Sequence, residues 1–429
     1  MRTILTSIAA GSLLAALAIA QPPQPRYTVT DLGTLGGSYT YAYGMNAAGW
    51  VTGGAATPTQ TGGLSQTAFL WHGGHMIDLG TLPGGLNSEG AGVNAIGEVA
   101  IVSETYKTDP NGEDFCAFGT HRQCLGATWK NGAMTPLPNL AGGHNAAAFD
   151  INNRGQISGF AENGTRDSTC LTGGTPFQVM RFEAVVWGPD GEIRELPPLR
   201  DDTVGFAFGI NDGGQVAGTS GLCSNTSIPP APSGAHAILW DKNGSPTDLG
   251  NLGGGYNVAA SVNNRGDVAG GALSGQDGTI HAFLWTRRTG MQDLGAFPGA
   301  FVTTATCCKT INDRDDVVGM AIDGTGLRAL LWQGKVPIDL NTLIPSSSGW
   351  YLQMACAINN AGEIVGQGLI NGEVHSFLLT PRHNSASYES AASAAPAVAS
   401  PTPLTEDTRK LIQRGIPFGR FGGQPISPR

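Results

Sequence analysis

A histidine and an aspartate stand close together in the stretch HAFLWTRRTGMQDLG, which runs from His281 and contains Asp293. Such a pair could serve as general acid and base or bind a metal ion. A nearly identical stretch, TAFLWHGGHMIDLG, starts with Thr67 in place of the histidine, and further copies have Glu183 or Arg328 there. Histidine recurs there only at His236 and His375. Because the position accepts His, Thr, Glu and Arg, we interpret it as a solvated strand edge that carries no chemistry.

The aspartate of the repeated Asp-Leu-Gly is replaced by Pro136 and Glu195 in two of the copies. An aspartate at the end of a strand can accept hydrogen bonds from the backbone N–H groups of its own turn. We therefore expect Asp293 and its equivalents to stabilise turns. The sequence also lacks the GxSxG, HExxH and CxxC motifs, so we predict no catalytic residue and no cofactor.

Two stretches have side-chain oxygens at spaced positions, as calcium-binding loops do: DPNGED at 109–114 and DKNGSPTD at 241–248. Neither has the full D-x-[DN]-x-[DN]-G-x5-E pattern. DKNG is better explained as a hairpin turn. DPNGED lies in an insertion, where a metal site stays an open alternative, but we assign no metal ligand.

The composition is that of a turn-rich β protein. The chain has 429 residues, of which 64 are glycine, and only 13% are charged. Its formal net charge is -9, and no run of Lys or Arg could follow a nucleic-acid backbone, so we exclude nucleic acid as a partner.

The two ends of the sequence differ from the rest. Residues 1–20 have a basic start, an apolar segment and the small-residue site Ala18-Ile19-Ala20, which indicates a secretory signal peptide. An N-terminal membrane anchor is the alternative. Residues 382–404 are rich in Ala, Ser and Pro and indicate a linker, and 405–429 form a basic tail that is either disordered or docks on a partner. We expect a secreted bacterial protein, extracellular or periplasmic, that is monomeric.

The opening phrase belongs to a repeat that spans most of the chain. Its strand ending in tryptophan recurs at intervals of 45 to 58 residues and ends the last time in Thr380. Each copy except the last is followed by a DLG-like strand, and then by an Asn with Gly, or once Asp315, three residues later. The tryptophans are Trp71, Trp129, Trp187, Trp240, Trp285 and Trp332, and the asparagines are Asn46, Asn94, Asn152, Asn211, Asn263, Asn312 and Asn359.

Each repeat predicts four short strands, which we name a to d. Asn followed by Gly indicates a tight turn between strands a and b, with the Asn side chain capping its own turn. Strand c, such as HAFLW, is apolar on both faces, as expected for a small sheet packed between two others. We therefore predict an all-β, seven-bladed β-propeller over 27–381, with four-stranded antiparallel blades and tryptophans packed between blades. The last unit lacks strand d, and the N-terminal YTVTDLG should supply it and close the ring.

The units HAFLW…G…DLG…IN..G..VG resemble the HAF repeat, named for that tripeptide. The resemblance covers Tyr27 to Pro381 and departs from the pattern at Thr380, Asp315 and Ile101. It implies a secreted propeller protein and brings no established activity and no functional residues.

Three insertions break the repeat, all between strands b and c of the second, third and fourth units. They contain four of the seven cysteines, and we predict the disulfides Cys116–Cys124 and Cys170–Cys223. Cys308–Cys356 is a third candidate, and a vicinal Cys307–Cys308 bond is disfavoured because its ring is strained. Cross-linked loops on a rigid scaffold are where binding usually resides. The ligand-binding candidates are Tyr106, Arg122, Arg166, Asp167 and Phe177.

We therefore favour a secreted binding or cell-surface interaction module whose ligand, a glycan or a protein, meets the insertions. The alternative is a secreted propeller enzyme, a hydrolase or lyase acting on glycans. It would need an acid–base pair that breaks the repeat and lies at the axial mouth. A purely structural role is the third reading.

Overall fold

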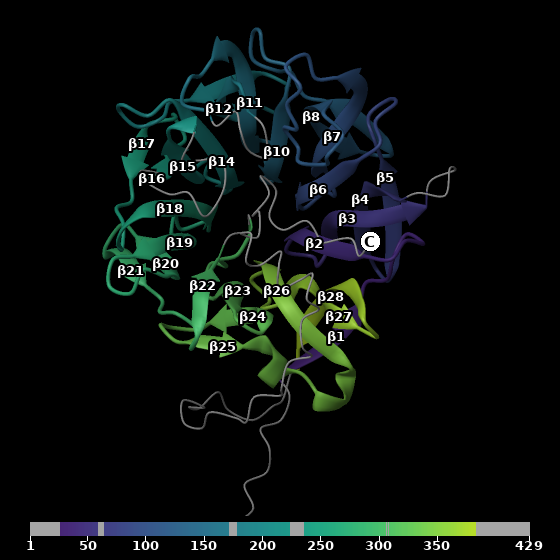
Figure 1. Ribbon diagram of the computed structural model, residues 1–429. Coiled ribbons are helices and arrows are strands. Elements are labelled where there is room, and N and C mark those ends of the chain that lie inside the picture. The colour runs from purple at the N-terminus through teal and green to yellow at the C-terminus, as the bar shows by residue number, and fades with distance from the viewer. Residues whose placement is uncertain are drawn as a thin grey trace, which may run out of the picture.

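A computed structural model describes residues 26–58, 64–170, 178–223, 236–305, 307 and 309–382. Apart from two short 3-10 helices, η1 (Leu340–Leu343) and η2 (Ser346–Ser348), its regular elements are β-strands. The strands form four-stranded antiparallel sheets that surround a common centre (Figure 1). Within the described residues no helix has the length and apolarity needed to span a membrane.

The first four sheets are each a simple meander of consecutive strands. The first three comprise β2 (Thr40–Met45), β3 (Val51–Pro58), β4 (Leu64–His72) and β5 (His75–Gly80); β6 (Ser88–Val93), β7 (Val99–Thr108), β8 (Arg122–Lys130) and β9 (Ala133–Pro136); and β10 (Ala146–Ile151), β11 (Ile157–Arg166), β12 (Met180–Trp187) and β13 (Ile193–Leu196).

The fourth sheet comprises β14 (Val204–Ile210), β15 (Val216–Gly221), β16 (His236–Trp240) and β17 (Pro246–Asp248). Two further sets of four are joined into one eight-stranded sheet by a single parallel pair, Ile280 with Val302. They are β18 (Gly253–Val262), β19 (Val268–Ser274), β20 (Ile280–Thr286) and β21 (Gly290–Asp293), and β22 (Ala300–Thr304), β23 (Val317–Asp323), β24 (Gly326–Trp332) and β25 (Pro337–Asp339).

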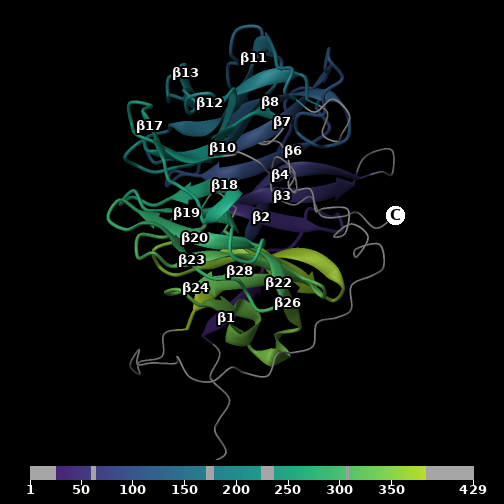
Figure 2. The same ribbon diagram turned by 60° about the vertical axis from the view of Figure 1, so that its left-hand side comes forward.

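The last sheet joins the two ends of the described chain. Strands β26 (Trp350–Ile358), β27 (Ile364–Ile370) and β28 (Glu373–Pro381) are completed by β1 (Tyr27–Asp31). Tyr27 pairs with Pro381 and Asp31 with Phe377 in antiparallel register, so β1 takes the place of strand d (Figures 1 and 2).

The repeated tryptophans pack between neighbouring sheets, as the apolar character of strand c predicts. Trp187, Trp240 and Trp332 are fully buried. Their indole N–H groups donate to backbone carbonyl oxygens in the preceding unit, at Pro138, Pro197 and Leu294. Each tryptophan thereby buries a large apolar ring and satisfies its one polar group.

The meander gives every sheet the same two ends. The a–b and c–d hairpin turns lie at one end, which we call the turn face. The b–c and d–a connections lie at the other, which we call the insertion face because the three long b–c connections belong to it. The innermost strands in Figure 1 are the a strands, β2, β6, β10, β14, β18, β22 and β26.

Candidate functional site

The repeated asparagines form a ring on the turn face, which we call the inner ring. Each caps its own turn as predicted; the Oδ1 of Asn152, for example, accepts from the backbone N–H groups of Arg154 and Gln156, both at 3.0 Å. In six units the side-chain Nδ2 also donates to the backbone oxygen of the equivalent asparagine in the next unit, over 2.9 to 3.5 Å, from Asn46, Asn152, Asn211, Asn263, Asn312 and Asn359. The last of these bonds runs from Asn359 to Asn46.

The residue after each asparagine adds an outer ring at the same mouth. Here a backbone N–H donates to the side-chain oxygen of the equivalent residue in the next unit, as from Asn153 to Asp212 at 2.9 Å and from Asp212 to Asn264 at 2.9 Å. The remaining members are Asp313 and Asn360. Ala47 and Ala95 occupy this position in the first two units and have no side-chain oxygen.

A central cavity of about 140 Å³ is lined by residues of both rings. Lys309 lines it, and the Lys309 Nζ lies 2.9 Å from Oδ2 of the fully buried Asp150. The same amino group donates to the backbone oxygen of Ile210 at 3.2 Å, so one residue links the sixth unit to the third and fourth. Burial raises the pKa of Asp150, and the Lys309 charge partly offsets this rise. Neither residue belongs to the repeat, and sequence analysis did not find the pair because its members are far apart in the chain.

On the insertion face, Tyr106 and Arg122 both lie against Gly84. The Tyr106 side chain is 68% exposed. Its Cβ would lie 2.8 Å from a methyl group placed on Gly84, and the Gly84 carbonyl oxygen accepts from Nη1 of Arg122 at 2.8 Å. Leu86, in the same d–a connection as Gly84, is 46% exposed.

The other candidates divide into three cases. Arg166 is exposed, and its Nη2 donates to Oδ1 of Asn111 at 2.9 Å. Asp167 is buried, which corrects the prediction that it faces a ligand: it accepts from the backbone and hydroxyl of Thr169 at 2.8 and 2.7 Å, and lies 3.5 Å from Arg181. These contacts lower the pKa of Asp167 despite its burial. Phe177 lies outside the described residues.

The cysteines pair across the insertions. The structure contains the predicted Cys116–Cys124 and Cys170–Cys223 bonds, with Cα separations of 6.1 and 4.6 Å. The third prediction was wrong in one partner, because Cys307 rather than Cys308 pairs with Cys356. A parallel bridge between Lys309 and Ala357 sets the local register and brings the Cα atoms of Cys307 and Cys356 to 5.0 Å. Cys308 itself lies outside the described residues.

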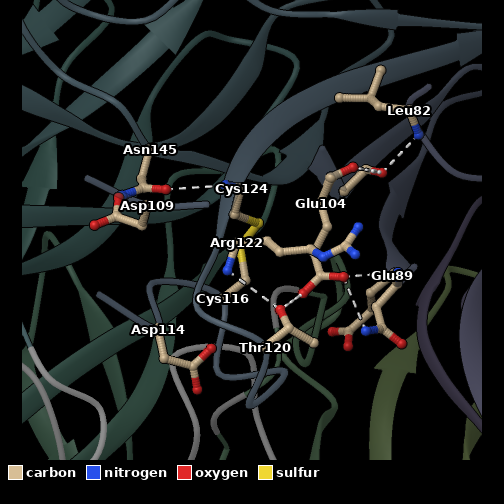
Figure 3. The surroundings of a disulfide bond; sticks show 12 residues. Leu82, Glu89, Glu104, Asp109, Asp114, Cys116, Thr120, Arg122, Cys124 and Asn145 are labelled. Carbon is tan, nitrogen blue, oxygen red and sulfur yellow. Dashed lines mark hydrogen bonds between the residues drawn. A yellow bond between two sulfur atoms is a disulfide. The ribbon is translucent and has the colours of Figure 1, made fainter. Parts of the chain in front are cut away.

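Buried carboxylates surround the first disulfide, and the sequence did not reveal their convergence. Figure 3 shows Asp109, Asn145 and Cys124 close together beside that bond. Asn145 Nδ2 donates to Oδ2 of Asp109 at 2.8 Å and to Oε2 of Glu162 at 2.9 Å. Asp109, Glu113 and Glu162 are all buried, and each has a carboxylate oxygen within 4.8 Å of the others.

Another buried acid, Glu89, lies apart from this cluster near the insertion end of β6. Its Oε2 accepts from the Tyr41 hydroxyl at 3.2 Å and from Nε2 of Gln66 at 3.0 Å. Burial raises the pKa of Glu89 to about 8, which outweighs the lowering effect of these two bonds. Burial, followed by the neighbouring Glu195 charge, likewise raises the pKa of Glu183 to about 7.

The repeated histidine is less solvated than predicted. His281 is buried, and its ring nitrogens contact Asp293 at 2.9 Å and Asp277 at 3.0 Å. His375 contacts Asp31 at 2.9 Å, and Arg328 takes the same role towards Asp339 at 3.2 Å. The prediction of a solvated strand edge was therefore wrong for His281, because this side chain pairs with the DLG aspartate across strands c and d. That aspartate also accepts from its own turn, as expected: Oδ1 of Asp293 binds the Gly295 N–H at 2.7 Å.

Comparison with known proteins gives no family. No protein-family model matches the chain, and no curated protein matches it. Solved structures with a similar fold include the β-propeller domain of the Trilobed protease from Pyrococcus furiosus, at 8% identity and a TM-score of 0.47, over 80% of this chain and 95% of that one. Streptogramin B lyase matches at 11% identity and a TM-score of 0.42, over 82% and 98%. Puromycin hydrolase matches at 12% and 0.49 over 80% of this chain, which spans only 52% of that enzyme.

Proposed function

We propose that the chain is a seven-bladed β-propeller, closed by its N-terminal strand, that acts outside the cell as a binding module. The count is supported by the seven asparagine turns and by the seven sets of four strands that result when the eight-stranded sheet is divided at its single parallel pair. Closure is supported by the pairing of β1 with β28 and by the hydrogen bond from Asn359 back to Asn46.

The family and the location rest on separate observations. The repeated pairing of the leading His or Arg with the DLG aspartate gives the HAF-type phrase a physical role, which supports membership of the HAF-repeat proteins. The three disulfides are compatible with an oxidising compartment, which supports secretion together with the expected signal peptide.

The single observation that carries the binding function is the presence of the exposed Tyr106 and the half-buried Arg122 around Gly84 on the cross-linked insertion face. An exposed aromatic ring offers its flat face to the apolar side of a sugar, and a guanidinium forms paired hydrogen bonds with carboxylates and hydroxyls. The disulfide Cys116–Cys124 and the Arg122 contact to Gly84 hold these groups in place before a ligand arrives, which limits the entropy lost on binding. We therefore propose a glycan that carries acidic groups as the ligand.

The experiment is a glycan array and a cell-envelope pull-down with the purified chain and the variants Tyr106→Ala and Arg122→Ala. Each substitution should weaken glycan binding at least about ten-fold, the loss typical of one anchoring contact. The matched control is Ile96→Ala, because Ile96 is 70% exposed on the turn face. Glycan binding that survives both substitutions, or a bound envelope protein with no glycan signal, would overturn the assignment.

The Asp150–Lys309 pair is the observation that favours the alternative, a secreted glycan hydrolase or lyase. Both residues break the repeat, and Lys309 lines the central cavity with the fully buried Asp150 behind it, near the axis where an acid–base pair is required. If this reading holds, the purified chain cleaves acidic polysaccharides, and Lys309→Met abolishes the cleavage while preserving secondary structure. Binding without cleavage favours the module.

A further inference from the structure

The insertion face contains an unusual concentration of buried negative charge. Asp109 and Glu113 lie in the connection between β7 and β8, and Glu162 lies in β11. They are 4%, 0% and 0% exposed, and each offers an oxygen within 4.8 Å of the other two. Three carboxylates from two neighbouring sheets thus converge on one buried point.

Within the described part of the chain, this charge is not balanced by a basic side chain. Across the described ranges, the ion pairs of this protein do not include Asp109, Glu113 or Glu162. Backbone and amide N–H groups bind some of their oxygens, but these donors carry no full charge. Like charges this close in a buried place repel strongly, so the cluster needs either a cation or bound protons.

Two oxygens of the cluster lack a hydrogen-bond partner among the residues that the structure describes. Glu113 Oε1 accepts from the backbone N–H groups of Val179 and Met180, at 2.5 and 2.8 Å, whereas Glu113 Oε2 accepts from no group. Gln178 is 1% exposed and its Nε2 donates to Oε1 of Glu162 at 3.0 Å, which places its amide at the cluster, yet Gln178 Oε1 also has no partner. Buried oxygens nearly always accept a hydrogen bond. These two do not, so both are available to coordinate a cation.

We propose that Asp109, Glu113, Glu162 and Gln178 bind a calcium ion. The donors are all oxygens, and three of them are carboxylates, the set that Ca²⁺ prefers. Ca²⁺ accepts bidentate carboxylates and amide oxygens in flexible geometry, whereas Mg²⁺ demands a regular octahedron and keeps several waters. A buried cluster of long Glu and Gln side chains suits the larger ion.

The ion would connect the two insertions that border the proposed binding face. Asp109 and Glu113 come from the loop that also carries Cys116, and Gln178 lies two residues before the start of β12. Calcium would therefore hold the β7–β8 and β11–β12 connections together, alongside the disulfides. This site does not depend on the identity of the ligand bound by Tyr106 and Arg122.

The test is calorimetric titration of the chelator-treated full chain with CaCl₂ and, separately, with MgCl₂. One Ca²⁺ should bind per chain, the melting temperature should rise with added Ca²⁺, and Mg²⁺ should bind at least about ten-fold more weakly. Glu113→Gln and Gln178→Ala should each weaken Ca²⁺ binding at least about ten-fold. The matched control is Asp114→Asn, the same kind of change one residue away; Asp114 accepts from the Gly119 N–H and lies outside the cluster.

A chain that shows neither heat nor a change in melting temperature up to millimolar Ca²⁺ overturns the proposal. A stabilised Glu113→Gln variant without Ca²⁺ dependence would then identify the cluster as carboxyl groups that share a proton. If Glu113→Gln does not fold, the wild-type titration and Gln178→Ala still decide the question.

Discussion

The two ends of the sheets are built on different principles. On the turn face, asparagine caps its own turn in every unit and bonds to the next sheet in six of them. On the insertion face, no residue is repeated in this way. There the second to fourth units rely on disulfides and buried acids, whereas units five to seven rely on His–Asp or Arg–Asp pairs.

This difference suggests where function can arise. Six units share the same hydrogen bond to the next unit, so a change in one of them disturbs its neighbour. The insertion face has no such constraint, and its residues can differ from unit to unit while the scaffold stays intact. Binding residues usually lie on loops of this kind, positioned by a rigid framework. The exception is Lys309, which lines the turn-face cavity and pairs with the buried Asp150.

The largest expected effect concerns Glu89, at the insertion end. Its pKa of about 8 lies above the ordinary 4.5, so the folded protein favours the protonated carboxyl. The resulting stabilisation is complete below pH 4.5 and is lost as the pH rises from 4.5 to 8, by on the order of 5 kcal/mol. In Glu89→Gln, urea unfolding should lose this part of its pH dependence, and the variant should exceed the wild type in stability at pH 9. Glu373→Gln, an exposed control, should follow the wild type; identical pH profiles for Glu89→Gln and wild type would refute the prediction.

The two insertion disulfides should differ in their contributions. Cys170 and Cys223 are 53 residues apart, and Cys116 and Cys124 only 8. Because a cross-link restricts the unfolded chain more when its loop is longer, replacing the first pair by alanines should cost about 4 kcal/mol and replacing the second about 2.5 kcal/mol. Denaturant unfolding measures both losses. Equal losses would mean that the folded insertion, and not the unfolded chain, sets the stabilisation.

The inner ring gives the matching test on the turn face. Asn152→Ala removes two caps and the Nδ2 bond to Asn211, and it leaves buried backbone groups unsatisfied. The expected loss is about 3 kcal/mol in the free energy of unfolding. Asn153→Ala, in the exposed outer ring, should cost less than about 1 kcal/mol. A similar loss in both variants would show that the two rings act as one network.

The architecture was predictable because it repeats. Seven asparagine turns and a strand apolar on both faces indicate stacked sheets, and the missing strand d predicts the pairing of β1 with β28, as the register of Tyr27 with Pro381 confirms. The caps by Asn152 and the turn bond of Asp293 were likewise predictable, because both are contacts within a few residues.

What escaped prediction depends on residues far apart in the chain. The bond from Asn152 to Asn211 needs the relative placement of two sheets, which no local pattern specifies. The same holds for Asp150 with Lys309 and for Glu113 with Glu162, which come from different units. Asp167 was misjudged because a charged residue in an insertion was expected to face a ligand, whereas it is buried, with Oδ1 bound by Thr169 and Oδ2 lying 3.5 Å from Arg181.

The smallest expected effect concerns His375 and Asp31, the side-chain pair across β28 and β1. Asp31 is 35% exposed in its side chain, and exposed ion pairs contribute little, so His375→Ala should lower the free energy of unfolding by less than about 1 kcal/mol. The attachment of β1 instead depends on its backbone pairing with β28 and on the burial of Tyr27 and Leu32. Hydrogen exchange of the β1 amides should therefore remain slow in His375→Ala and become fast in Tyr27→Ala. Fast exchange in the histidine variant would mean that the side-chain pair holds the N-terminal strand, and that the insertion end depends on its charged pairs as strongly as the turn end depends on its asparagines.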